Sequence, residues 1–289
     1  MANSKIEWTQ KVWNPVTGCT KISAGCENCY AEKFAKRLAG RCGYDQENPF
    51  KITSHEDKIY EPAKWRKPKI VFVGSMGDIF HDDVPDHWID AIMATAAIFP
   101  KHTFMFLTKR PKRMQEYFSR SKEEILKNWE DSIYQIGWAD KDGDVDSTAC
   151  FLYNYSQKHW PIPNIWLGVT VENQATANYR IPLLGETLAA KRFISVEPML
   201  GNLFIGGYLS GYDIKWVICG GENGQGARPM HPDWVSSLLG QSHLLAIPFF
   251  FKGWGEWLYY NNSSAHKLGK KKSGRMIDGK EYLQYPKFK

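Results

Sequence analysis

Residues Gly18–Tyr30 read GCTKISAGCENCY and place three of the chain's six cysteines within eleven residues. Cys19, Cys26 and Cys29 follow the spacing C-x6-C-x2-C. A glycine precedes each of the first two cysteines, which allows the backbone to turn tightly there. So many thiols in so short a loop favour a metal centre.

The residues after the third cysteine predict a helix that begins at the thiol. Tyr30, Phe34 and Leu38 recur at i, i+4 and i+8, the spacing of the apolar face of an amphipathic helix. The N-terminal N–H groups and the dipole of such a helix favour anionic thiolates and whatever they hold.

The thiol spacing separates the classes of site only in part. A disulfide framework is disfavoured because the chain is long and has few cysteines. Structural zinc wants four ligands, and no second C-x-x-C pair is present, although Cys42 is a candidate fourth ligand. A 4Fe–4S cluster on three cysteines leaves one iron open, as radical S-adenosylmethionine enzymes require. Zinc and unligated structural cysteines stay as alternatives.

Length and composition are those of a globular protein. The 289 residues are 43% hydrophobic and 24% charged, enough for one large α/β domain or two small ones. No apolar run reaches 18 residues and no charged-then-apolar leader opens the chain. We expect a soluble, cytoplasmic protein with reduced thiols and no membrane association.

The positive charge is concentrated at the C-terminal end. The chain has a net charge of +6, and residues 252–289 hold nine Lys and Arg against three Asp and Glu. The run KKKSGR at Lys270–Arg275 is the focus. It indicates either a solvated mobile tail or a contact with nucleic-acid phosphates.

Apolar segments alternate with helical ones along the chain. The expected strands are Ile6–Asn14, Ile70–Val73, Thr103–Leu107, Asn164–Val169, Arg192–Ile194, Ile214–Cys219 and Ile247–Phe251. Helices are expected from Pro85 to Ile98 and from Pro232 to Leu245. This alternation predicts parallel βαβ units in a complete or partial (β/α) barrel or in an open doubly wound sheet. No G-x-G-x-x-G follows the first strand, which disfavours a dinucleotide-binding sheet.

Residues 119–163 interrupt the alternation. They are polar, and we interpret them as an insertion that serves as a substrate lid. The acidic run Asp140–Asp146 has its glycine two places too early for an EF-hand and lacks the closing glutamate. We expect a barrel-like catalytic domain over residues 1–257, including the insertion, and a basic extension over 258–289.

Polar residues follow nearly every expected strand. They are Asp78, Thr108, Lys109, Thr170, Glu172, Ser195, Glu197, Glu222 and Lys252. Each alone is typical of a helix cap or a loop charge. In a parallel barrel, however, all strand ends of this kind gather on one face, where barrel active sites lie. Together they therefore predict one pocket, with carboxylates for hydroxyl or amine groups and cations for carboxylate or phosphate.

A family resemblance rests on six segments as a set, within residues 5–257. The segments are Gly74–Phe80, Leu107–Arg110, Trp166–Asn173, Ser195–Pro198, Gly220–Glu222 and Lys252–Gly255. They resemble a phage-associated family of uncharacterised three-cysteine proteins. That family is itself similar to radical S-adenosylmethionine enzymes, with spore photoproduct lyase as a distant relative.

The resemblance implies the ligands and the cofactor. It implies a 4Fe–4S cluster on Cys19, Cys26 and Cys29, in a barrel of the radical S-adenosylmethionine type, with the methionyl amine held at Gly74–Asp78. The chain departs from the usual pattern in its six-residue first gap, in Asn28 before the last thiol and in Asp78. The residues expected to bind S-adenosylmethionine are Gly74, Ser75, Gly77, Asp78, Thr108, Lys109, Thr170 and Ser195. The residues expected to be catalytic are Glu172, Glu197, Glu222 and Lys252.

The functional hypothesis is therefore an enzyme that uses an external electron donor to cleave S-adenosylmethionine to a 5′-deoxyadenosyl radical. The basic tail and the aromatic content favour a nucleic-acid substrate, for base modification or repair. The alternative is a non-catalytic nucleic-acid-binding protein stabilised by zinc or by an iron–sulfur cluster. A zinc hydrolase or deaminase is disfavoured, since neither H-E-x-x-H nor the H-x-E with P-C-x-x-C pair occurs.

Overall fold

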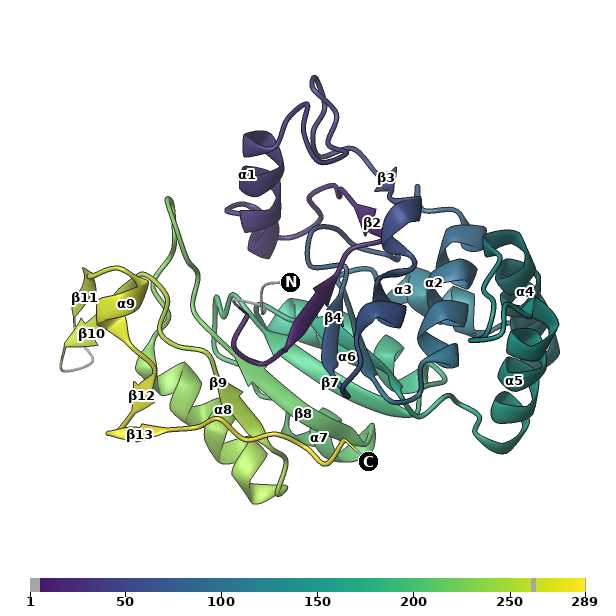
Figure 1. Cartoon of the computed structure of the whole chain (residues 1–289). Helices are drawn as coiled ribbons and strands as arrows, with labels where there is room; N and C mark the ends of the chain where they lie inside the picture. The colour runs from purple at the N-terminus through teal and green to yellow at the C-terminus, as the bar shows by residue number, and fades with distance from the viewer. Residues whose placement is uncertain (1–5, 261–263, 289) are drawn as a thin grey trace. The chain divides into compact units, whose positions relative to one another are not determined.

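The computed structural model describes residues 6–260 and 264–288, with seven strands hydrogen-bonded in the order β1-β4-β5-β6-β7-β8-β9 (Figure 1). Their bounds are β1 Lys11–Trp13, β4 Ile70–Val73, β5 Thr103–Thr108, β6 Ile165–Thr170, β7 Lys191–Val196, β8 Ile214–Cys219 and β9 Phe249–Phe251. The first three pair in parallel, as do the last three. Each strand neighbours the next sheet strand along the chain, without the reversal of a doubly wound sheet. This order agrees with a partial (β/α) barrel.

The chain divides into two units of contact. The first comprises the described residues up to Cys19, then Phe34–Leu167 and Thr187–Lys191. The second comprises Thr20–Lys33, Gly168–Glu186 and the described residues from Arg192 onward. Strand β6 contributes to both. The expected domain boundary after residue 257 stays a prediction, and the residues beyond it belong to the second unit.

The first strand is shorter than expected. A turn closed by the N–H of Thr9 on the carbonyl of Ile6, at 3.2 Å, occupies the start of the segment Ile6–Asn14. The N–H of Ile70 donates to the side-chain oxygen of Gln10 at 3.0 Å, where a strand residue would offer its backbone carbonyl. Only Lys11–Trp13 therefore joins the sheet.

In the first unit, β4 and β5 form a buried pair because they are continuous apolar runs, typical of strands covered on both faces. Val71 lies opposite Phe104 and Val73 opposite Phe106. Helix α2, Asp86–Ile98, connects the two strands and has the expected bounds. Short elements complete this unit's framework: β2 Val16–Thr17, β3 Thr53–Ser54, η2 Glu56–Lys58, η3 Glu61–Lys64 and α3 Pro111–Phe118.

Residues 119–163 form two helices, α4 (Lys122–Ile136) and α5 (Val145–Lys158), which pack beside α2 (Figure 1). The indole N–H of Trp129 donates to the Tyr117 hydroxyl and that of Trp138 to the Thr95 hydroxyl, each at 2.9 Å. These buried tryptophans make the helices part of the core, unlike the lid that the sequence suggested. The polar composition that suggested it lies on the helices' outer faces.

The acidic run before α5 serves local turn chemistry. The carboxylate of Asp140 accepts the N–H groups of Asp142 and Asp144, at 2.8 and 3.0 Å. Asp144 in turn caps α5 by accepting the N–H of Asp146 at 2.9 Å. Such Asx turns and caps are the ordinary use of aspartate beside a helix start.

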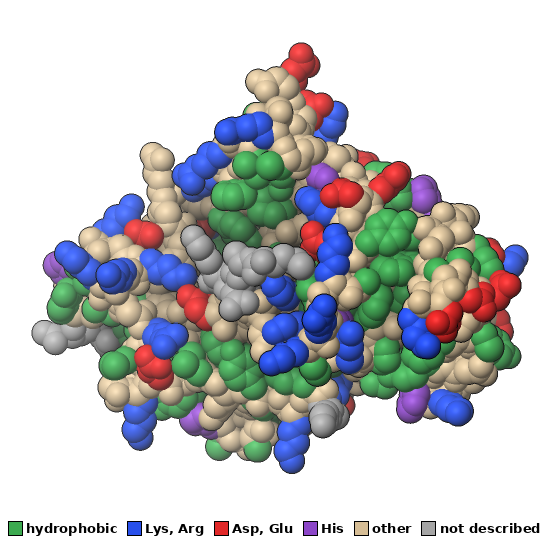
Figure 2. Space-filling model, in the orientation of Figure 1, with side chains coloured by type: hydrophobic (Ala, Val, Ile, Leu, Met, Phe, Trp, Pro, Cys, Tyr) green, Lys and Arg blue, Asp and Glu red, His purple; other side chains and the backbone are tan. Residues whose placement is uncertain are grey.

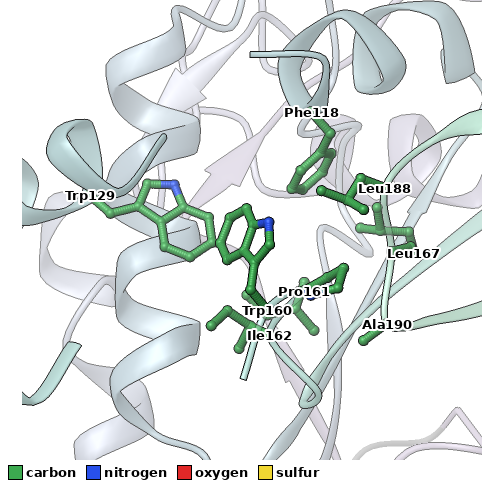
Figure 3. Close-up of a pocket in the computed structure, with 10 residues that line it drawn as sticks. Phe118, Trp129, Trp160, Pro161, Ile162, Leu167, Leu188 and Ala190 are labelled. Carbon is green, nitrogen blue, oxygen red and sulfur yellow. The ribbon is translucent and has the colours of Figure 1, made fainter. Parts of the chain in front are cut away.

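A small apolar pocket lies where α3, α4 and β6 meet in the first unit (Figure 3). Its walls include Phe118, Trp129, Trp160, Ile165 and Leu188. None of the predicted site residues lines it. We therefore assign it to the packing of the helical pair.

In the second unit, β7, β8 and β9 carry a core of large side chains that are fully buried, among them Phe193, Trp216 and Phe249. The helices of this unit are α6 Gln174–Glu186, α7 Gly206–Gly211 and α8 Pro232–Leu244. Helix α8 agrees with the expected Pro232–Leu245 helix. Two further elements, η1 Ala24–Cys26 and α1 Tyr30–Arg37, belong to the thiol segment.

The C-terminal residues pack on β9. The N–H of Phe251 donates to the Tyr282 carbonyl at 2.7 Å, and Gln284 N–H donates to the Phe249 carbonyl at 3.1 Å. The elements between are β10 Trp257–Tyr260, β11 Ser264–Lys267, α9 Lys270–Ser273, β12 Met276–Ile277 and β13 Lys280–Glu281. The described part of the tail is thus folded, which contradicts the interpretation as a mobile extension.

Candidate functional site

The first thiol is anchored in the first unit beside the glycine loop after β4. Gly18 has φ +96°, and its N–H donates to the Met76 carbonyl at 3.0 Å. The N–H of Cys19 donates to the Phe50 carbonyl at 3.2 Å. A Cβ atom on Gly77 would lie 2.6 Å from the Gly18 carbonyl oxygen, so only glycine fits there. The expected cofactor loop Gly74–Asp78 therefore touches the residue that precedes Cys19.

The loop after β4 is held by buried polar groups. The side-chain oxygen of Asn14 accepts the Ser75 hydroxyl at 3.2 Å and the Met76 N–H at 3.0 Å. The Asp78 carboxylate accepts the Thr108 hydroxyl at 2.8 and 2.9 Å and the Lys109 N–H at 3.0 Å. The structure thus brings together Asp78, Thr108 and Lys109, three of the expected cofactor residues.

The other two thiols lie in the second unit, on a tight turn before α1. Cys26 ends η1, and the N–H of Cys29 donates to the Cys26 carbonyl at 3.3 Å. The Cys29 carbonyl then accepts the N–H of Lys33 at 3.3 Å, which starts the helical hydrogen bonding. Both thiols are half-buried. As expected, a helix begins directly after the third cysteine.

A buried carboxylate at the end of β6 holds this thiol turn. Glu172 is completely buried, and its carboxylate accepts the Ser23 hydroxyl at 2.8 Å. Arg180 from α6 neutralises it, with Nη1 3.0 Å from Oε2, and also donates to the Thr170 carbonyl at 2.7 Å. A Cβ atom on Gly25 would lie 2.5 Å from Glu172 Cγ. The loop therefore approaches the carboxylate as closely as a glycine permits.

A second carboxylate, after β8, holds the turn through an arginine. The guanidinium of Arg228 donates to both oxygens of Glu222, at 2.7 and 2.9 Å. The same guanidinium donates to the Ala24 carbonyl at 2.8 Å and to the Glu27 carboxylate at 2.9 Å. Burial alone would raise the pKa of Glu222, but its hydrogen bonds to Arg228 hold that pKa below its usual value. We call the pairs Glu172–Arg180 and Glu222–Arg228 the loop clamps.

The loop that carries Arg228 makes further contacts with the thiol segment. The side-chain amide of Asn28 donates to the Gly226 carbonyl at 2.8 Å. The ammonium of Lys33 donates to the Gln225 carbonyl at 2.9 Å. Residues on both sides of Cys29 are therefore tied to the segment after β8.

The remaining expected catalytic residues form a third ion pair in the second unit. Lys252, after β9, donates to both oxygens of Glu197, after β7, at 2.5 and 2.6 Å. Both side chains are partly exposed, at 14% and 24%. Ser195 is buried, and its carbonyl accepts the N–H of Val171 at 2.9 Å. In the Glu172–Arg180 and Glu222–Arg228 pairs at least one partner is buried, whereas both Glu197 and Lys252 are partly exposed to solvent.

The donor set fits an iron–sulfur cluster chemically. Thiols are the ligands that hold such clusters, and all six cysteines of the chain are outside disulfides. Within residues 6–260 and 264–288, no group of three His, Cys, Asp or Glu side chains is gathered around a metal-ion position. Cys19 belongs to one unit and Cys26 and Cys29 to the other.

Arg180, Arg228 and Ser23 were not predicted from the sequence, and Gly25 was predicted as a turn residue without its contact to Glu172. A usable signal was present for these two carboxylates, since Arg180 follows Glu172 by eight residues and Arg228 follows Glu222 by six. These contacts give Glu172 and Glu222 a role in positioning the thiol turn. Their expected catalytic role stays a prediction, as do the roles of the other expected site residues.

A family model described as "Protein of unknown function (DUF5131)" matches residues 3–286. A comparison with curated proteins found no match. The family match agrees with the expected relationship to uncharacterised proteins, and the phage association stays an expectation.

Solved structures of spore photoproduct lyase are weakly similar to this chain. One, complexed with dinucleoside spore photoproduct, has a TM-score of 0.45 and 10% identity over 83% of this chain and 62% of its own. A mutant with bound AdoMet and dinucleoside spore photoproduct has a TM-score of 0.43 and 11% identity over 83% and 62%. This chain thus spans about three fifths of those proteins. Similarity at this level carries no inference about activity.

No helix in the described part of the chain is long and apolar enough to cross a membrane.

Proposed function

Because the chain belongs to the DUF5131 family, whose description assigns no activity, we propose a function from its own residues: a radical S-adenosylmethionine enzyme that acts on nucleic acid. Cys19, Cys26 and Cys29 would hold a 4Fe–4S cluster through their thiolates. When bound, such a cluster supplies one electron from an external donor, which cleaves S-adenosylmethionine to a 5′-deoxyadenosyl radical.

The observation that carries this proposal is the pair of loop clamps. The buried carboxylates of Glu172 and Glu222, with Arg180 and Arg228, hold the turn that carries the Cys26 and Cys29 thiols. The Glu172–Arg180 pair is buried at both partners, and because a buried ion pair is costly to desolvate and contributes little net stability, we attribute to it the role of fixing the geometry of the turn. A turn fixed in this way suits thiols that must hold a cluster in one position.

Residues of the first unit would bind S-adenosylmethionine. Gly18 touches the loop Gly74–Asp78, so that loop lies next to the first ligand, Cys19. Its backbone carbonyls and the Asp78 carboxylate are acceptors of the kind an ammonium group requires. In the second unit, the partly exposed Glu197–Lys252 pair would face the substrate, offering one acceptor and one donor.

Metal analysis of anaerobically purified protein tests the proposal. We expect a brown protein with iron and sulfide, which releases 5′-deoxyadenosine from S-adenosylmethionine once reduced with dithionite. A colourless protein with bound zinc and no such release would instead support the non-catalytic nucleic-acid-binding alternative.

Replacing Asp78 by Asn should weaken S-adenosylmethionine binding and leave the iron content unchanged. Losing a charged acceptor costs about 1.5–3 kcal/mol, so the Kd should rise about tenfold to 150-fold. Isothermal titration calorimetry on iron-loaded protein measures this. Asp90→Asn is the matched control, because Asp90 is a buried carboxylate of the same unit that accepts from Tyr117 and Arg120. An equal effect in both variants would exclude a cofactor role for Asp78.

The basic turn α9 would contact phosphates of the substrate. Its three lysines are exposed, and the turn is anchored by Ser273 Oγ on the Gly255 carbonyl and by Trp254 N–H on the Gly274 carbonyl at 3.1 Å. The hydrogen bonds attach the lysines to the segment directly after β9. Phosphate contacts from a fixed turn lose less conformational entropy than contacts from a mobile tail.

Changing Lys270, Lys271 and Lys272 to Ala should weaken oligonucleotide binding and reduce its salt dependence. Each lost phosphate contact lowers the slope of log K against log salt by about 0.7–0.9. A salt series of binding measurements with DNA and RNA oligonucleotides tests this. The control variant replaces the exposed Lys101, Lys112 and Lys141 and changes net charge equally. If the α9 variant and the control variant have equal salt slopes, the lysines of α9 act only through net charge and do not contact phosphates.

A further inference from the structure

Helix α1 presents two aromatic rings to solvent directly after a proposed cluster ligand. Tyr30 follows Cys29 in the chain and is 58% exposed, and Phe34, one turn later, is 47% exposed. Residues four apart lie on one face of a helix, about 5–6 Å apart at their Cβ atoms. The two large exposed rings therefore lie on one side of the helix, one turn apart.

The orientation of α1 differs from the one expected from its sequence. Tyr30, Phe34 and Leu38 were expected on the buried face, yet Ala31 and Ala35 are the buried residues. Small side chains allow a helix to pack closely, and this choice turns the rings outward. Exposing two rings forgoes the stabilisation that burial of a large apolar side chain would give.

Cations share the face that carries the rings. Lys33 and Arg37 stand at i+3 and i+7 from Tyr30, so the stripe reads ring, cation, ring, cation. The Lys33 ammonium also donates to the Gln225 carbonyl, whereas Arg37 is exposed. The helix's one carboxylate, on Glu32, lies 3.2 Å from the ammonium of Lys21. Figure 2 shows hydrophobic side chains beside Lys and Arg over α1. We call Tyr30, Lys33, Phe34 and Arg37 the α1 stripe.

We propose that the α1 stripe binds single-stranded nucleic acid, with bases stacked on Tyr30 and Phe34 and phosphates near Arg37 and Lys33. Stacking rings interleaved with cations are the recurring design of single-strand binding surfaces. The cations are complementary to a phosphate backbone, and the rings can stack on bases that are exposed because they are unpaired. A duplex has its bases already stacked on one another, so they are not available to stack on the two rings.

The inference rests on the proposed function in one respect, the choice of nucleic acid as substrate. It adds that the strand is single or locally unpaired where it meets the protein. Because Tyr30 adjoins Cys29, a strand on the stripe lies next to the proposed cluster ligand. A base taken out of its stack is the form on which base-modifying chemistry acts.

The test is binding of a fluorescent oligothymidylate and of a duplex of equal length, by anisotropy, to anaerobically purified protein. Tyr30→Ala and Phe34→Ala should each weaken oligothymidylate binding about fivefold to 150-fold, since stacking contributes ~1–3 kcal/mol per base. The Tyr30→Trp and Phe34→Trp double variant should retain or strengthen binding. Arg37→Ala should lower the single-strand salt slope by about 0.7. Duplex affinity should change less than single-strand affinity in both alanine variants.

Phe151→Ala with Tyr153→Ala is the control, because these α5 rings are exposed to a similar degree, 43% and 54%. If the α1 double-alanine variant binds oligothymidylate no more weakly than this control, the proposal is wrong. If that α1 double-alanine variant instead accepts electrons more slowly from an acidic flavodoxin, the α1 stripe is the docking surface for the electron-donor protein. Iron and sulfide are measured on the same samples. If the protein contains zinc and its α1 alanine variants still lose single-strand binding, the radical chemistry is refuted but the α1 stripe remains a nucleic-acid-binding surface.

Discussion

Protein in which Cys19, Cys26 or Cys29 is replaced by Ala should contain almost no iron or sulfide after anaerobic purification. With three thiolates and one open iron, no ligand is dispensable, so each single loss should abolish the cluster. Iron and sulfide analysis, together with the visible absorbance of the brown cluster, measures the effect. We expect a loss of well over ninety per cent in each variant, on the order of complete removal.

The chain supplies its own controls for this experiment. Cys42 and Cys150 are exposed, and Cys219 is buried, where burial raises the pKa of its thiol and opposes the thiolate form that binds metal. Ala at these three positions should leave the iron content unchanged. If Cys42→Ala loses its metal as fully as Cys29→Ala, the site has four thiols and no open iron. The argument for S-adenosylmethionine as a ligand would then fail.

Replacing Glu172 by Ala should strongly destabilise the protein. It leaves the guanidinium of Arg180 buried, at 4% exposure, without its counter-charge. Breaking a buried pair in this way costs about 3–5 kcal/mol. Urea unfolding of the iron-loaded protein measures the free energy of unfolding. The rate at which the protein loses iron to a chelator measures how firmly the thiol turn retains the cluster.

Two further variants separate the clamp from general stability. Glu281→Ala breaks the exposed Arg275–Glu281 pair and should cost about 0–1 kcal/mol, with no change in iron retention. Gly25→Ala keeps all four clamp residues but places a Cβ atom 2.5 Å from Glu172 Oε1, so the carboxylate or the turn must shift. It should accelerate iron loss to the chelator. If Glu172→Ala loses iron no faster than Glu281→Ala, the clamps are structural only.

The order of elements was predictable because it depends on local pattern. Ile70–Val73 and Ile214–Cys219 are apolar runs, which are buried as strands whatever surrounds them. Helix α2 starts after Pro85 and ends at Ile98, as the proline and the apolar run indicate. Strand β1 was overestimated because Ile6 and Thr9 form a turn and the Gln10 side chain accepts the Ile70 N–H in place of a backbone carbonyl.

The site was predictable in its residue types and not in its contacts. Glu172 and Glu222 were identified as strand-end carboxylates, yet their partners are remote in sequence. The hydrogen bond from Ser23 to Glu172 spans 149 residues, and the one from Arg228 to Ala24 spans 204. No local pattern encodes such pairs, because buried charges choose partners by three-dimensional proximity.

The sequence by itself determined the alternation of strands and helices, the three clustered thiols and the charge of the C-terminal segment. These properties belong to residues and their neighbours along the chain. Only the tertiary structure decided that Ala31 and Ala35 face inward on α1, that α4 and α5 pack beside α2 as core, and that two carboxylates hold the thiol turn. The physical reason is that burial and ion pairing depend on which distant surfaces meet, and a helix can bury either of two faces until its partner is in place.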